Sequence, residues 1–221
     1  MAKIKKFFYF MLGVLLLPSL WALVRALVGG RFFGGGKNLL ALVGGIALFV
    51  LVYFLLPRRS RPTRAYVLAH ELTHALFGWL DGARIGRIRV AKESGSVMLS
   101  KTSLLTLLAP YFFPFYTVIL IVLVGITACF VSLAPYRLWI YGLIGVTWGF
   151  HLCFTLSTLL QHQTDISRSG YLFSYVAILY LNLVVLTCGL LVATPASGLD
   201  FLRHWWDMNL RTYLGLWHLF V

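Results

Sequence analysis

The chain has 221 residues, of which 60% are hydrophobic and 11% are charged, whereas soluble domains carry about 25% charged residues. This composition excludes an ordinary soluble globular protein. It predicts an all-α, multi-pass integral membrane protein, because a helix satisfies its own backbone hydrogen bonds in lipid. The formal net charge is +13, but the basic residues cluster at the ends of apolar runs, where anionic headgroups attract them. We therefore expect the lipid bilayer, and no nucleic acid, to be the partner of these charges.

Residues 1–64 predict an N-terminal transmembrane hairpin with a basic linker. The apolar run 7–28 follows three lysines and resembles a signal peptide, but it is too long for a typical one. This favours an uncleaved first span. A glycine-rich turn at 29–36 leads to a second run over 39–56. The basic segment 57–64 is expected on the cytoplasmic side, where positively charged loops are retained.

Residues 65–192 form the predicted core. The short apolar run 65–80 would make a helix about 24 Å long, somewhat less than the hydrocarbon thickness of about 30 Å. Residues 84–100 alternate polar and apolar side chains around Ser94 and Gly95, which predicts a small β-hairpin. Three further apolar runs are long enough to span the membrane: 104–133, 138–160 and 171–192.

Together these runs predict about six membrane helices. Pro110 and Pro114 predict a kink in the fourth of them. A polar segment, 161–170, separates the last two spans. The tail 193–221 is rich in Trp and mixes Arg with Asp, which predicts an amphipathic helix lying in the membrane interface.

The residues that carry chemistry stand in the short run 65–80. His70, Glu71 and His74 belong to the sequence H-E-x-x-H. On a helix, the four-residue spacing places both imidazoles on one face, where they could bind one Zn²⁺. The Glu beside the first His could take a proton from metal-bound water. Since His and Glu are costly in an apolar segment and tend to be functional there, the pattern predicts a zinc-dependent hydrolase with Glu71 as the general base.

A hydrolytic zinc site usually has three protein ligands, so a third is required. Asp165 is the preferred candidate, because a carboxylate just before the last long run could be directed inward at the metal. Two alternatives stay open. Asp81 could be a ligand or could end the metal-binding helix together with Gly82, and His162 could be a ligand or support one. His151 is the remaining candidate, but inside a membrane run it is expected to hydrogen-bond between helices.

In three features the chain resembles the site-2 protease family of intramembrane metalloproteases. These are an H-E-x-x-H helix in the membrane, a hairpin-like stretch after it, and a distant Asp before a later helix. The resemblance covers the predicted core. It implies that His70, His74 and Asp165 bind zinc and that Glu71 is the catalytic base. It also implies that the hairpin helps to hold an unwound substrate helix and that the substrates are membrane-anchored proteins.

The basic hairpin also predicts the depth of the site. If 65–80 crossed the membrane completely, the hairpin would be extracytoplasmic, against the positive-inside tendency. If helix and hairpin return to the cytoplasmic side, the next two spans bring 161–170 back to that side. We therefore expect a metal site at shallow depth near the cytoplasmic face, in a protein of the cell membrane. The rival interpretations are a non-proteolytic metal-binding scaffold and an ion transporter.

Overall fold

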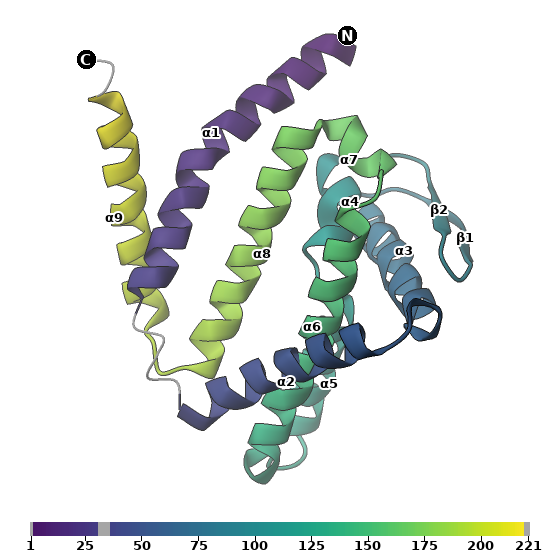
Figure 1. Ribbon diagram of the computed structural model, residues 1–221, viewed down its shortest axis with the longest axis vertical. Helices are drawn as coiled ribbons and strands as arrows, with labels where there is room; N and C mark the ends of the chain where they lie inside the picture. Colours follow the sequence, from purple (N-terminus) through teal and green to yellow (C-terminus); the bar gives the residue numbers. More distant parts are fainter. Residues whose placement is uncertain (1, 31–35, 219–221) are drawn as a thin grey trace. The chain divides into compact units, whose positions relative to one another are not determined.

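The computed structural model describes residues 2–30 and 36–218. Most of these residues are helical, and the hairpin expected at 84–100 is present (Figure 1). Residue 1, residues 31–35 of the predicted glycine-rich turn and residues 219–221 of the predicted tail helix lie outside the described residues. The helices are α1 (Ala2–Gly29), α2 (Gly36–Leu55), α3 (Thr63–Leu80), α4 (Leu104–Leu108), α5 (Phe115–Ala128), α6 (Arg137–Leu159), α7 (Thr164–Ser169), α8 (Tyr171–Ala193) and α9 (Gly198–Trp217). The strands are β1 (Ile85–Val90) and β2 (Gly95–Leu99).

Within the described residues, four helices are long and apolar enough to cross a membrane: α1, α2, α6 and α8. A fifth crossing is added if two consecutive segments are counted as one bent span. These segments are Leu104–Tyr111 and Phe115–Ala128, and they meet at a bend of 83°. Pro114 immediately precedes α5, so the bend lies where the prolines predict it. The helix α3 would be the sixth, and it does not meet these criteria, so a count of six crossings stays a prediction.

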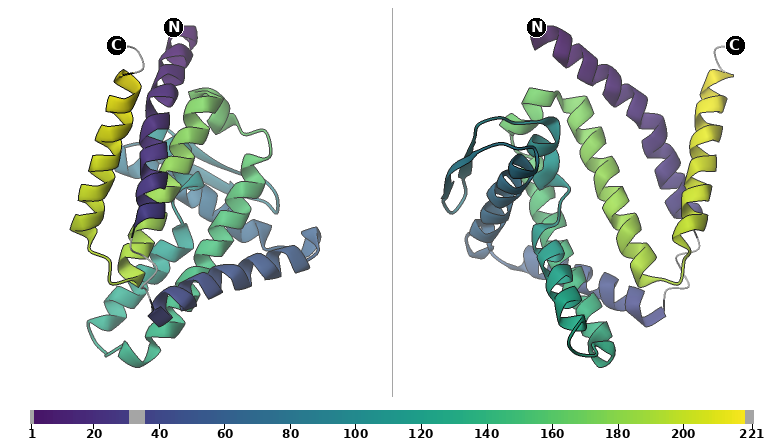
Figure 2. Two further views of the ribbon diagram at one scale, coloured as in Figure 1. Left: turned by 60° about the vertical axis from the view of Figure 1, so that its left-hand side comes forward. Right: turned by 180° about the vertical axis from the view of Figure 1, so that it is seen from behind.

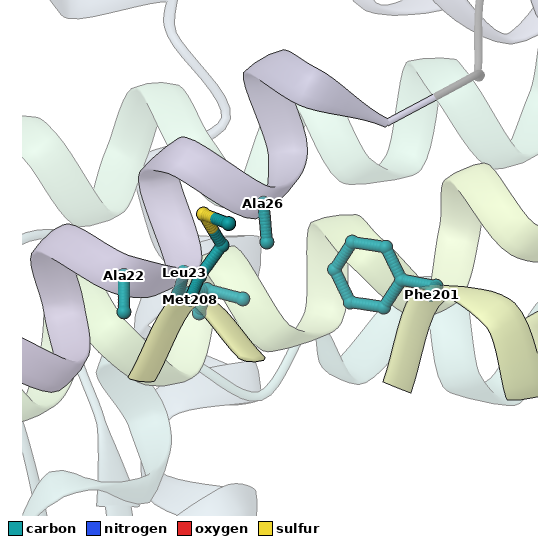
Figure 3. Packing of buried hydrophobic residues seen from close by; sticks show 5 residues of the cluster. All are labelled: Ala22, Leu23, Ala26, Phe201 and Met208. Atoms are coloured by element: carbon teal, nitrogen blue, oxygen red, sulfur yellow. The ribbon is translucent and has the colours of Figure 1, made fainter. Parts of the chain in front are cut away.

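The chain divides into two compact units, and the first comprises Met1–Gly36 and Thr164–Val221. Within it, α1 packs against both α8 and α9 (Figure 2). The helix α9 runs along α1, since the Tyr213 hydroxyl donates a hydrogen bond of 2.7 Å to the Leu15 carbonyl. A small apolar core fills the other end of this helix pair; it consists of Ala22, Leu23, Ala26, Phe201 and Met208 (Figure 3).

The second unit comprises Lys37–Gln163 and contains the H-E-x-x-H helix. Glycines let α2 and α6 pack backbone to backbone. A Cβ at Gly145 would lie 3.0 Å from the Cα of Gly45, and one at Gly149 would lie 3.0 Å from the Cβ of Phe49. Small residues spaced four apart allow such close approach between membrane helices. An aromatic cluster of Tyr53, Tyr66 and Phe154 then joins α2, α3 and α6.

The strands β1 and β2 form an antiparallel hairpin, the only sheet among the described residues. Ile88 pairs with Val97 and Val90 pairs with Gly95, with an irregularity in register between Ile85 and Ile88. The hairpin packs against α3 (Figure 1). Leu99 makes this contact at one end of β2, because a Cβ on Gly78 of α3 would lie 2.9 Å from its Cδ1.

Candidate metal centre

A specific backbone turn ends α3, the helix of the H-E-x-x-H sequence. Gly82 has a φ of 72°, a left-handed conformation that favours glycine. Its N–H donates to the Trp79 carbonyl, and the N–H of Ala83 donates to the Gly78 carbonyl, each at 2.8 Å. These bonds form a Schellman motif with Asp81 as the C-cap. The prediction that Asp81 and Gly82 end the helix is confirmed.

His70 and His74 lie one turn apart on the same face of α3. Their ring centroids are 4.8 Å apart, with the ring planes at 80° to each other. His74 is buried and His70 is half-buried. The ring of Tyr111 meets His70 edge-on, with 5.2 Å between centroids, which restricts the orientations open to that imidazole. The pair has the arrangement that the i, i+4 spacing predicts.

A backbone carbonyl fixes the orientation of His74. Its Nδ1 lies 2.7 Å from the carbonyl oxygen of Thr106. Because a carbonyl only accepts, Nδ1 of the neutral ring carries the proton and Nε2 keeps its lone pair. Metal-ligating histidines almost always donate their second ring N–H in this way. The second histidine is therefore held in the tautomer that ligates a metal through Nε2.

Pro110 explains why the Thr106 carbonyl is available. In an α-helix this carbonyl would accept from the N–H four residues later, which here belongs to Pro110 and does not exist. The N–H of the preceding residue, Ala109, donates to the Leu105 carbonyl instead. The proline thus leaves one carbonyl of α4 without its helical donor, and His74 supplies a replacement.

Glu71 lies beneath the start of β2. Its side chain is 6% exposed, although a carboxylate is seldom buried to this extent. A Cβ on Gly95 would lie 2.6 Å from both Cγ and Oε1 of Glu71, and 2.7 Å from Cγ1 of Val67. Only glycine fits between the hairpin and the carboxylate without a shift. The turn predicted around Ser94 and Gly95 therefore closes over the motif glutamate.

The third ligand predicted from the sequence was Asp165, in the first turn of α7. One ligand atom from each of His70, His74 and Asp165 lies within 4.8 Å of the others, so these residues form a group that could hold a metal ion. The alternatives, Asp81 and His162, belong to no such group in the part of the chain that the structure describes. His162 is exposed, and the Asp81 carboxylate accepts hydrogen bonds from hydroxyl groups.

A small cavity adjoins His70. Its polar lining includes Thr73 and Tyr116 as well as His151 of α6. Hydroxyl and imidazole groups of this kind are the partners that a buried water molecule requires. Nδ1 of His151 lies 3.5 Å from the Thr155 hydroxyl on the same helix. His151, for which we expected an interhelical hydrogen bond, thus lines the same cavity as the first histidine of the motif.

Three residues of the site were missed by the sequence analysis: Thr106, Tyr111 and Gly95. The signal for Thr106 was its position four residues before Pro110, which frees a carbonyl. Gly95 was identified as a turn residue, but its contact with Glu71 depends on how the hairpin packs. No local signal marks Tyr111, because its contact with His70 spans 41 residues.

The comparisons with known proteins add no relative, since no family model, curated protein or solved structure matches this chain. The function therefore has to be argued from the residues of the site.

Proposed function

We propose that this protein is a zinc metalloprotease that hydrolyses peptide bonds of membrane-anchored proteins. The proposal is carried by one observation: His70 and His74 share a face of α3, with Nδ1 of His74 bound to a carbonyl. This tautomer leaves the lone pair of His74 on Nε2, as ligation of a metal by that nitrogen requires. The membrane setting is supported by the long apolar helices of the chain.

The donor set suits zinc. Two imidazoles and one carboxylate are a ligand combination known from catalytic zinc sites, in which water takes the fourth position. His70, His74 and Asp165 would hold the ion, and their proximity supports this assignment. When bound, zinc would supply Lewis-acid chemistry, polarising a peptide carbonyl and acidifying a water molecule.

Glu71 would be the general base. It neighbours His70 in the sequence and is buried under the hairpin, so few water molecules compete for its oxygens. In this role it accepts a proton from the attacking water and returns it to the leaving amine. The cavity beside His70, with its hydroxyl groups, offers a place for water on the same side of α3 as that histidine.

The substrate would enter as an extended segment. The strands β1 and β2 form a two-stranded sheet, and an open sheet edge can pair with a peptide through main-chain hydrogen bonds. The hairpin also carries several exposed basic residues, which favour the cytoplasmic face of the cell membrane; they are Arg84, Arg87, Arg89 and Lys92. The proposed site therefore acts near that face on proteins anchored in the same bilayer.

The two glutamates of the chain provide a matched test. Glu71→Gln should retain zinc and lose cleavage of a single-span reporter protein reconstituted in the same vesicles. Glu93→Gln, at an exposed position, should retain both. If the protein were a metal-binding scaffold, the wild type and both variants would bind zinc and none of them would cleave the reporter. An ion transporter would show ion flux into the vesicles and no proteolysis, and either result would reject the proposal.

A further inference from the structure

We infer that Asp81 is a positioning residue of the metal site, acting on His74 through the first turn of α4. The inference rests on the proposed metal-binding role of His74. It assigns a function to the carboxylate that the sequence analysis weighed as a ligand. The connection runs from Asp81 through the hydroxyls of Ser103 and Thr106 to the Thr106 carbonyl, and from there to Nδ1 of His74.

The first step joins the end of α3 to the start of α4. The Ser103 hydroxyl donates to Oδ2 of Asp81, and the Thr106 hydroxyl donates to the same oxygen at 2.5 Å. Ser103 is also the N-cap of α4, accepting from the Thr106 N–H at 3.0 Å. One carboxylate therefore anchors both hydroxyl groups of this turn.

The ionised carboxylate suits this position because it only accepts hydrogen bonds, and charge-assisted bonds are stronger than neutral ones. The bond from Ser103, followed by that from Thr106, lowers the pKa of Asp81, and Lys101 lowers it further. Asp81 is thus negatively charged at neutral pH. An amide at the same place would keep the shape but lose the charge that holds the two donors.

The second step passes through Thr106, which is 1% exposed. Its hydroxyl binds Asp81 and its carbonyl binds His74. The Leu107 N–H, which shares a peptide unit with this carbonyl, donates to the Ser103 carbonyl at 3.0 Å, so the direction of the Thr106 carbonyl depends on the first turn of α4. Asp81 anchors that turn through the hydroxyls of Ser103 and Thr106. If the anchor is lost, the carbonyl can turn, and Nδ1 of His74 is no longer compelled to carry the proton.

A role confined to helix capping predicts different measurements. Capping alone would lower the melting temperature of the metal-free protein and leave zinc affinity unchanged. Positioning changes zinc affinity and the tautomer of one histidine. Loss of such supporting contacts commonly weakens metal binding about 10–100-fold, so the two roles can be separated in purified protein.

The test compares the full-length wild type with Asp81→Asn, and with Asp200→Asn as a control at an exposed helix-capping turn. Zinc affinity is measured by chelator competition. The His74 tautomer is measured in metal-free protein by ¹⁵N NMR, with the signal assigned by its loss in His74→Gln. We expect Asp81→Asn to weaken zinc binding about 10–100-fold and to lose the Nδ1–H tautomer, while Asp200→Asn changes neither.

A second pair of variants covers the case in which Asp81→Asn does not fold. Thr106→Val removes the hydroxyl at nearly constant volume, and Thr106→Ser restores it. The valine variant should weaken zinc binding and the serine variant should recover it. Unchanged affinity and tautomer in Asp81→Asn or Thr106→Val would overturn the inference. If the wild type binds no zinc but the tautomer still depends on Asp81, the positioning role stands and the proposed function fails.

Discussion

His74 and Thr106 are joined by a hydrogen bond that is possible because Pro110, four residues after Thr106, has no N–H to occupy the Thr106 carbonyl. Nδ1 of His74 lies 2.7 Å from the Thr106 carbonyl, whose helical donor would be the missing N–H of Pro110. The helix α3 and the short helix α4 are thereby connected by a bond that also selects the tautomer of a proposed ligand.

Restoring the N–H at position 110 should disturb this bond. In Pro110→Ala, the new N–H competes with His74 for the Thr106 carbonyl, so we expect zinc affinity to fall, by up to about tenfold. Zinc titration of purified protein measures the effect. Pro114→Ala is the control, because it changes a proline of the same bend that precedes α5. Equal losses in both variants would show that the bend, and not the carbonyl, matters.

A methyl group at Gly95 should separate metal binding from cleavage. Gly95→Ala places a Cβ 2.6 Å from Oε1 of Glu71, so the hairpin or the carboxylate must move. We expect zinc content to stay close to that of the wild type and reporter cleavage to fall by about 10²-fold, the effect of a misplacement of about 1 Å at a catalytic group.

Gly86→Ala is the matched control on the other strand. Its Cβ would meet Met98 Cβ at 3.1 Å, a contact within the hairpin and away from Glu71. Cleavage by this variant should remain within about threefold of the wild type, since surface substitutions usually change little. If Gly95→Ala cleaves the reporter as well as Gly86→Ala does, the hairpin does not position the general base.

Acid should remove the stabilising effect of Asp81. Because hydrogen bonds lower its pKa in the folded protein, its contribution is complete above the unfolded value of about 3.9 and is lost as pH falls through the folded value. The melting temperature of the metal-free wild type should therefore exceed that of Asp81→Asn near neutral pH. The two should converge at a pH below about 3.9. A difference that persists unchanged in acid would contradict this explanation.

The crossing of α2 and α6 should tolerate no large side chain. Gly145→Leu forces atoms against the backbone of Leu42 and Gly45, and overpacking of this kind typically costs about 1–3 kcal/mol. Unfolding in detergent should show the loss. Gly125→Leu, on α5 where a Cβ meets nothing within 4 Å, should unfold like the wild type, and equal destabilisation would contradict the proposed packing.

The helices, the hairpin and the histidine pair could be predicted from local patterns. Apolar runs, the alternation at 84–100 and the four-residue spacing of His70 and His74 each depend on residues close together in the sequence. The end of α3 at Asp81 and Gly82 is local in the same sense. What could not be predicted is the set of contacts between segments. The bond from Thr106 to His74 joins residues 32 apart, and Gly95 meets Glu71 only because the hairpin folds back on α3.

Zinc content per polypeptide chain tests the central claim most directly. Wild type, Asp165→Ala and Asp207→Ala should be purified in parallel, the last being a control in an exposed ion pair with Arg211. We predict about one zinc per chain in the wild type and the control, and a sharp loss in Asp165→Ala, as a site with three protein ligands requires. Undiminished zinc in Asp165→Ala, or no zinc in the wild type, would contradict the account.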